Sequence, residues 1–433
     1  MDFQQALALW LVVGVVAAGC RKEPANERPR ITITSPAESS SITVPDTLLV
    51  TVEAHDDIGL HSVSATLLDE HDIPVVSGVA ASASGTSAVI TMALPITSEQ
   101  LPSGPYKLLA TVSDGSLNNK DVRNLHVTGA PLRVRAVFTV VEAPPGSIVL
   151  YKTDSTGATA PAATWNMDLG GAAVDATAQR LFVAGSTTGD LRALWPDGLG
   201  TAWGLPNLSS TGIPWFTAVD LCADGRLYVG QGDNTIHAYN PKNGIGGTVA
   251  ALPALFRARQ VVTNGDLLVA TERHFVTGEH RLGVYFRQSG APLSSQPLSV
   301  DPVGLFPRDA DHVLIFGNSN GVGRVLDRTL SGSGTWEAYT WAAPITAVER
   351  TGPSTWLVAL SNGDLQRFTY GGMGSISIGT TPVLTTMAYD AVNGRVYCGT
   401  ADGVLMINPV TGASSTAWSV GGTVRKVLPL LNR

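Results

Sequence analysis

The stretch of sequence richest in chemically active side chains is ERHFVTGEHR, from Glu272 to Arg281. It holds two histidines, two glutamates and two arginines within ten residues. Side chains of these types can bind a polar ligand through charge and hydrogen bonds. A zinc site is disfavoured, because His274 and His280 are six positions apart with no structural constraint that pairs them. A solvated hairpin with charged flanks is the alternative interpretation.

Other side chains could add to such a site. Arg257 and Arg259 lie on the approach to the adjacent strand. Trp215 in IPWF and Trp195 in WPDG could each stack on a sugar ring if exposed, although packing is the favoured role of both. The sequence therefore predicts a ligand site made of Trp215, Arg257, Arg259, Glu272, Arg273, His274 and His280.

The rest of the sequence offers no activated nucleophile, metal cage or acid–base pair. GxSxG, HExxH and Walker-type loops are absent from it. His55, Asp56, Asp57 and Asp114 do not form the dense oxygen-ligand loop that Ca²⁺ needs, so we interpret the acids as turn-forming residues. We expect no metal and no cofactor.

The charge balance excludes one class of partner. The chain has 28 Lys and Arg against 35 Asp and Glu, a net charge of −7. A mildly acidic protein lacks the basic surface that nucleic acids require. A hydrophobic share of 44% is ample for large cores, and the length predicts two or three domains.

A repeat of short strands must position these side chains. Residues 217–244 read as three strands joined by tight turns, and the pattern returns from Ala172, Gln260 and Thr386. A period of around forty residues is typical of a four-stranded propeller blade. The second-strand landmarks, spaced by 46, 40, 46, 43 and 40 residues, are Phe182, Tyr228, Leu268, Leu314, Leu357 and Tyr397.

The two ends of this repeat region complement each other. Residues 133–169 begin with Arg135 to Glu142, which looks like a second strand, so the inner strand of this blade is missing. Thr423 to Leu431 form a lone strand after the last complete blade. We infer that this strand completes the first blade, so residues 131–433 form a seven-bladed β-propeller closed by the C-terminal strand.

Two sets of motifs resemble known propellers. The turns NPKNG (240–244) and NPVTG (408–412) resemble those of quinoprotein-like and related lipoprotein propellers. A second motif resembles that of the lactonase-like and lyase-like superfamily of propellers, and it consists of Asp220, Gly225, Leu227 and Tyr228. The second resemblance implies that a divalent cation could be held near the central channel. The inner-strand acids recur at corresponding blade positions, which instead favours a turn-capping role; they are Asp175, Asp220, Glu349 and Asp390.

The segment before the propeller predicts a β-sandwich. Seven short strands alternate with turns in residues 30–130: 31–36, 47–54, 60–68, 74–79, 88–94, 106–112 and 122–127. The motifs DDIGL, GPY and VSDG resemble bacterial immunoglobulin-like and cadherin-like modules. Such folds often use a tyrosine like Tyr106 to bond the backbone at a corner. The expected fold class is all-β: an immunoglobulin-like β-sandwich followed by the propeller.

The start of the sequence predicts lipidation. The apolar run from Ala6 to Ala18 ends in Ala17-Ala18-Gly19-Cys20, which resembles the lipobox of bacterial lipoproteins. The resemblance implies a signal peptide over residues 1–19, acylation of Cys20 and a lipidated tether over 20–29. Arg21 points to the outer membrane of a Gram-negative bacterium. A transmembrane helix is the alternative, but the apolar run is short for one.

Cys222 and Cys398 are expected far apart around the ring, as buried free thiols.

We therefore expect a lipid-anchored binding or scaffold protein that presents a propeller face to a protein or glycan partner. The alternative is a lactonase-like or lyase-like propeller enzyme that acts on a sugar, lactone or peptide-like substrate.

Overall fold

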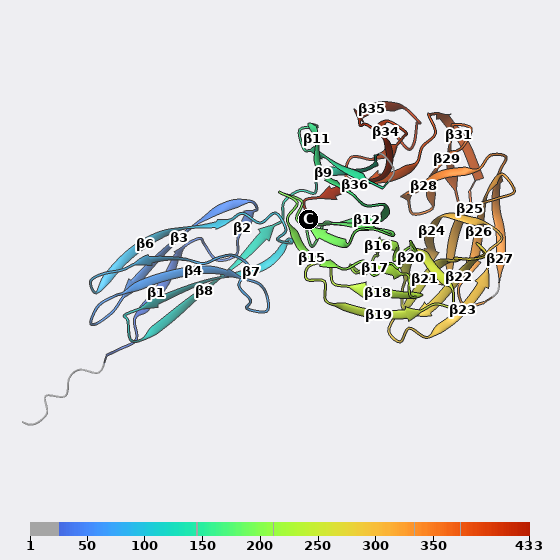
Figure 1. Cartoon of the computed structure of the whole chain (residues 1–433). Coiled ribbons are helices and arrows are strands. Elements are labelled where there is room, and N and C mark those ends of the chain that lie inside the picture. The colour runs from blue at the N-terminus through green and yellow to red at the C-terminus, as the bar shows by residue number, and fades with distance from the viewer. Residues whose placement is uncertain (1–25, 144–145, 211, 333, 373) are drawn as a thin grey trace, which may run out of the picture. The chain divides into compact units, whose positions relative to one another are not determined.

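The computed structural model describes residues 26–143, 146–210, 212–332, 334–372 and 374–433, and every regular element among them is a β-strand. The chain divides into two compact units at the Pro131–Leu132 bond (Figure 1). The predicted signal peptide and Cys20 lie outside the described residues. The fold is therefore all-β, as the sequence predicts.

The first unit has two sheets around one hydrophobic core. One sheet has the order β1-β3-β6 and the other β2-β8-β7-β4-β5. Val50, Val52 and Ala54 of one strand are buried and alternate with more exposed residues, because successive side chains of a strand point to opposite faces. The strands are β1 (Arg30–Ser35), β2 (Ser40–Thr43), β3 (Asp46–His55), β4 (Ser62–Leu68), β5 (Val79–Ser82), β6 (Ser87–Ile96), β7 (Gly104–Ser113) and β8 (Asn118–Thr128).

Two details of this unit differ from the sequence prediction. The short polar strand β2 was not predicted; it pairs in parallel with β8. A strand was predicted over 74–79, but Pro74 makes only an isolated bridge to Leu68 and the strand β5 begins at Val79. Proline has no amide hydrogen for a ladder. The predicted role of Tyr106 is confirmed: its hydroxyl donates to the Pro102 carbonyl oxygen at 3.1 Å.

The second unit consists of seven four-stranded sheets, here numbered 1 to 7 along the sequence. Sheet 1 has the order β11-β10-β9-β36, and the other six use consecutive strands. Sheets 1 to 3 contain β9 (Val134–Glu142), β10 (Ile148–Asp154), β11 (Thr159–Trp165), β36 (Thr423–Leu431), β12 (Leu169–Asp175), β13 (Arg180–Gly185), β14 (Leu191–Leu194), β15 (Thr201–Leu205), β16 (Phe216–Leu221), β17 (Leu227–Gln231), β18 (Thr235–Tyr239) and β19 (Gly246–Ala251).

Sheets 4 to 7 repeat the same antiparallel order. They contain β20 (Phe256–Asn264), β21 (Leu267–His274), β22 (His280–Phe286), β23 (Pro292–Pro297), β24 (Asp301–Asp309), β25 (His312–Ser319), β26 (Val322–Thr329), β27 (Thr335–Trp341), β28 (Ile345–Gly352), β29 (Thr355–Leu360), β30 (Asp364–Thr369), β31 (Gly374–Thr380), β32 (Thr386–Asp390), β33 (Arg395–Gly399), β34 (Gly403–Ile407) and β35 (Ser414–Ser419). Short strands joined by tight turns give each sheet its regular meander.

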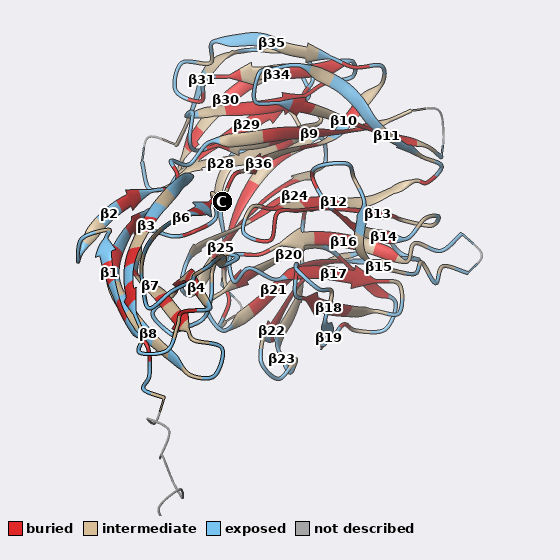
Figure 2. Cartoon of the chain, turned by 90° about the vertical axis from the view of Figure 1, so that its left-hand side faces the viewer, coloured by how far each residue is buried: buried red, intermediate tan, exposed pale blue. Residues whose placement is uncertain are grey.

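The C-terminal strand pairs where the sequence predicts. β36 runs antiparallel to β9, with Thr423 opposite Glu142 and Leu431 opposite Val134 (Figure 1). A separate hydrophobic cluster fills the space between each pair of successive sheets, and the last one joins sheet 7 to sheet 1. Figure 2 shows these buried segments in red. The arrangement is propeller-like, and the pairing of β36 leaves the inner edge of β9 covered.

Tryptophans of the outer strands connect neighbouring sheets. The indole Nε1 atoms of Trp203, Trp341 and Trp418 donate to the Pro241 carbonyl, the Ser375 hydroxyl and the Thr139 hydroxyl, respectively. Each acceptor belongs to the next sheet or to a turn of it. Gly244 is required beside Trp203: it has a φ of +71°, and a Cβ there would lie 2.7 Å from the indole.

Candidate functional site

The polar segment 272–281 is mostly strand. Glu272, Arg273 and His274 belong to β21, and His280 and Arg281 to β22. Only residues 275–279 form the turn between these two strands. The ladder runs on to the Arg273–His280 pair, and the Gly278 amide closes the turn by donating to the His274 carbonyl at 2.9 Å.

Strand alternation separates the charged residues of this segment. Arg257 of β20 lies directly opposite Arg273 of β21, whereas Glu272 lies opposite Ala258. Neighbouring side chains of a strand point to opposite faces, so Glu272 and Arg273 cannot serve the same site. A β-bulge between Ala258 and Gln260 inserts Arg259 as an extra residue. This strand register places Arg257 and Arg273 on one face of the sheet and Glu272 on the opposite face.

Three of the predicted residues line one cavity, which we call the arginine pocket. Its volume is about 350 Å³, within the range of pockets that hold small ligands. The connection from β15 to β16 supplies one wall, and β16, β20 and the end of β21 supply the rest. The lining residues are Gly212, Ile213, Pro214, Thr217, Arg257, Arg259, Arg273 and Phe275.

Arg257 forms the buried part of this pocket. Its side chain lies over the Phe275 ring, with the guanidinium carbon 4.4 Å from the ring centre, and the residue is only 7% exposed. Its Nε atom is buried without a hydrogen-bond partner, and so is the Thr217 hydroxyl. Burial lowers the pKa of Arg257, but an arginine keeps its charge in proteins. The pocket therefore holds a desolvated cation with unused donors.

No carboxylate among the described residues forms an ion pair with Arg257, Arg259 or Arg273. Seven other arginines of the second unit lie within ion-pair distance of an aspartate or glutamate, whereas the buried Arg180 and Arg328 have no such partner among the described residues either. The paired arginines are Arg135, Arg281, Arg287, Arg308, Arg324, Arg395 and Arg425. What distinguishes Arg257, Arg259 and Arg273 is that they line the same pocket. The pocket is thus a local concentration of positive charge on an acidic protein.

His280 is a further basic residue beside the pocket. Its Nε2 atom lies 3.4 Å from an Asp301 carboxylate oxygen, and its Nδ1 atom is buried without a partner. Burial lowers the pKa of His280, the positive charges of Arg273 and Arg259 lower it further, and Asp301 opposes both effects. His280 therefore lies close enough to the arginines to sense their charge.

The other three predicted residues do not line the pocket. Glu272 is fully buried and accepts a hydrogen bond from the Tyr285 hydroxyl; burial raises the pKa of Glu272 to about 7. The His274 Nδ1 atom accepts the amides of Val276 and Thr277 at 3.3 and 3.0 Å and so caps the turn. Trp215 packs over Gly232 and against the core between sheets 2 and 3.

The sequence reasoning missed several residues of the pocket. Thr217 carries no signal in the sequence, because it reads as an ordinary strand residue. Phe275 could have been found as an aromatic residue within the charged segment 272–281, and it is 45% exposed. Ile213 and Pro214 lie next to Trp215, so the motif IPWF marked the right connection but the wrong side chain.

A second cavity, of about 380 Å³, lies among the first strands of the sheets and holds Asp220, Glu349 and Lys426. Asp175 and Asp390 cap turns, as predicted: Asp175 accepts the Thr177 amide at 2.8 Å and Asp390 the Val392 amide at 3.1 Å. The same prediction was wrong for Asp220 and Glu349, which line this central cavity.

Register explains the difference. Asp175 forms the last pair of its strand ladder, whereas Asp220 is followed by one more pair, Leu221 with Leu227. A shift of one residue turns a side chain to the other face. Asp220 accepts the Val261 amide of the next sheet at 2.9 Å. Burial raises the pKa of Glu349 to about 7, against the effects of a backbone amide and of Lys426.

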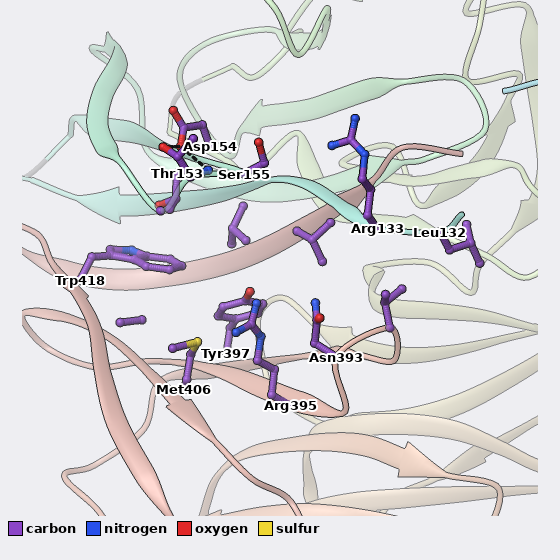
Figure 3. A pocket seen from close by; sticks show the side chains of 16 residues that line it. Leu132, Arg133, Thr153, Asp154, Ser155, Asn393, Arg395, Tyr397, Met406 and Trp418 are labelled. Carbon is purple, nitrogen blue, oxygen red and sulfur yellow. Dashed lines mark hydrogen bonds between the residues drawn. The ribbon is translucent and has the colours of Figure 1, made fainter. Parts of the chain in front are cut away.

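A third cavity, of about 550 Å³, lies between sheets 7 and 1 (Figure 3). Its polar groups are already paired. Asp154 accepts amides of its own turn, Arg395 contacts Asp390, and the Trp418 indole donates to Thr139. Figure 3 shows Trp418, Met406 and Tyr397 of sheet 7 in this groove, with the polar Asn393 and Arg395 beside them. It offers fewer unused donors than the arginine pocket.

Within residues 26–433, leaving out the undescribed positions, no group of three or more His, Cys, Asp or Glu side chains is placed to hold a metal ion. The same residues include no helix of the length and apolarity needed to cross a membrane. Cys222 and Cys398 are buried free thiols, as predicted.

Chemically, the arginine pocket can bind an anion through several guanidinium donors.

No match to a curated protein was found. Among solved structures, the chain is similar to a quinonprotein alcohol dehydrogenase-like protein from Bacteroides thetaiotaomicron, with 10% identity and a TM-score of 0.48 over 93% of this chain and 99% of the other. It is similar to BamB from Moraxella catarrhalis, with 17% identity and a TM-score of 0.42 over 62% and 80%. At these values neither similarity bears on function. Residues 29–110, within the first unit, match the bacterial Ig domain family.

Proposed function

We propose that this protein is a binding protein of the bacterial envelope, and that the arginine pocket receives an anionic group of its partner. In this proposal residues 30–130 form an immunoglobulin-like sandwich that acts as a spacer. Residues 131–433 form a seven-bladed β-propeller closed by β36. The seven sheets, their successive cores and the pairing of β36 with β9 support the propeller.

The observation that carries the proposal is the uncompensated charge of Arg257, Arg259 and Arg273. Burying a cation without a partner is unfavourable. Placing like charges directly opposite each other across two strands, as Arg257 and Arg273 are, is unfavourable as well. An anion in the pocket would remove both costs, because a carboxylate or phosphate accepts several guanidinium donors at once. Ligand binding therefore gives a physical reason for an arrangement that weakens the free protein.

Titration calorimetry on the full-length protein tests this proposal with a small panel of anions: acetate, inorganic phosphate and galacturonate. We expect at least one anion to bind, with an affinity that falls as salt is added. Arg257→Gln should abolish the binding, whereas Arg324→Gln, which removes an arginine paired with Glu337, should not. If none of the anions binds, or if Arg257→Gln leaves binding unchanged, the pocket is not an anion site.

The anchoring part of the proposal is supported by Ala17-Ala18-Gly19-Cys20 after an apolar run and by the match to bacterial Ig domains. We propose that Cys20 carries lipid and holds the protein in the outer membrane. Cys20→Ala should abolish metabolic labelling with a palmitate analogue. Labelling of the variant at the level of the natural protein would refute lipidation at this residue.

The central cavity favours a second candidate, an enzyme. Glu349 and Asp220 line it together with Lys426, and a carboxyl whose pKa lies near 7 can act as a general acid or base. The substrate would be a sugar, lactone or peptide-like molecule. Turnover of aryl lactones, aryl glycosides or a chromogenic peptide that is lost in Glu349→Gln would support catalysis. Absence of turnover of all three by the natural protein would count against it.

A further inference from the structure

The rim of the arginine pocket is apolar and exposed. Ile213 and Phe275 line the pocket and are 37% and 45% exposed. Leu255, 42% exposed, is joined to this turn because the Phe275 amide donates to its carbonyl at 3.0 Å. Val276, the next residue, is 68% exposed. Two large apolar side chains, Ile213 and Phe275, therefore border the guanidinium groups, and Leu255 and Val276 are exposed beside the same turn. Exposed apolar residues gathered around a pocket mark an interaction site.

The polar groups inside the pocket are almost all donors. A guanidinium donates five hydrogen bonds and accepts none. The Thr217 hydroxyl is the one side-chain oxygen in the lining, and no carboxylate or side-chain amide belongs to it. A sugar hydroxyl donates as well as accepts, so it would leave donors unmatched here. A carboxylate only accepts, and it fits the donor set completely.

Together these features describe a ligand with a carboxylate next to an apolar group. A polysaccharide acid has the charge but presents hydroxyl groups to the rim. A peptide segment can place a carboxylate on Arg257 and an apolar side chain on Phe275 at the same time. The buried arginine, stacked on an exposed aromatic ring, has the character of an interface hot spot.

We propose that the arginine pocket and its apolar rim bind an acidic, hydrophobic peptide segment of a protein partner. The carboxylate comes from a glutamate or aspartate side chain or from the free C-terminus of the peptide, since both present the same group. This inference rests on the proposed function, because it names the partner of the same pocket. It goes further by excluding glycans as the preferred ligand.

Fluorescence anisotropy with short labelled peptides and the full-length protein tests the inference. The main probe is a peptide with both ends blocked that alternates glutamate and leucine. Replacing its glutamates by glutamine, or its leucines by serine, should each weaken binding about tenfold or more. A glutamine–leucine peptide with a free C-terminus tests the other source of the carboxylate. Oligogalacturonate and inorganic phosphate serve as competitors.

Arg257→Gln should weaken binding of the main probe about thirtyfold or more, the loss expected when one member of a buried, hydrogen-bonded charge pair is removed. The exposed Arg273→Gln gives the same test if Arg257→Gln fails to fold, and Arg324→Gln is the control. If oligogalacturonate or phosphate binds through Arg257 more tightly than either carboxylate peptide, the peptide inference is overturned and the anion site stands. If no anion binds at all, both proposals fail.

Discussion

Replacing Glu272 by glutamine should stabilise the second unit at alkaline pH and leave it unchanged at acidic pH. Glu272 is fully buried, its Oε2 atom has no hydrogen-bond partner, and burial raises its pKa from 4.5 to about 7. The folded state therefore binds more protons than the unfolded state between about pH 4.5 and 7. The stability that the protonated Glu272 contributes is complete below pH 4.5 and is lost as the pH rises through 7.

The size of the effect follows from the two pKa values. A difference between 4.5 and about 7 corresponds to about 3 kcal/mol of unfolding free energy. Glutamine keeps the oxygen that accepts the Tyr285 hydroxyl and cannot ionise. The variant should therefore match the natural protein at pH 4.5 and exceed it by up to about 3 kcal/mol at pH 8.

Urea unfolding followed by tryptophan fluorescence measures this difference. All tryptophans after Trp10 lie in the second unit, so the signal reports on that unit alone. Comparing variant with natural protein at each pH removes the contribution of other groups, such as Glu349, that titrate in the same range. Glu279→Gln, at an exposed position of the adjoining turn, should change stability by no more than about 0.5 kcal/mol at either pH. An equal effect of Glu272→Gln at pH 4.5 and pH 8 would refute the argument.

Three further predictions concern the cores. Trp356→Ala should lower the unfolding free energy of the second unit by about 3 to 5 kcal/mol in the same urea assay, because the fully buried indole packs against Phe316 and Phe368; a loss below about 1 kcal/mol would contradict that packing. Tyr106→Phe should cost the first unit about 1 kcal/mol, the usual contribution of one hydrogen bond, and calorimetry should show its transition lowered while that of the second unit stays in place. In a Cys20→Ser background, Cys222 and Cys398 should react with a thiol reagent only after unfolding, because both are buried and burial raises the pKa of each thiol; fast reaction of the native protein would show that one is accessible.

Much of the fold is readable from the sequence because it depends on local chemistry. Turn residues such as those of NPKNG stop one strand and start the next, and alternation of apolar residues fixes which face is buried. The repeat spacing then sets the number of sheets. The missing inner strand near Arg135 and the lone strand at Thr423 to Leu431 predicted the one non-local pairing among the described strands of the second unit, β36 with β9.

The candidate site depended on the tertiary structure, because register and packing decide which side chains meet. The sequence marked Glu272 and Arg273 alike, but their alternation in β21 sends one into the core and the other to the pocket. It grouped Asp220 with Asp175, and one extra residue pair turned Asp220 to the central cavity. Thr217 and Ile213 come from another sheet and its preceding connection, some forty residues or more before Arg257. Spacing along the sequence reports the period of a repeat, whereas a pocket between repeats is set by the bulges and pairings that exist only in the folded protein.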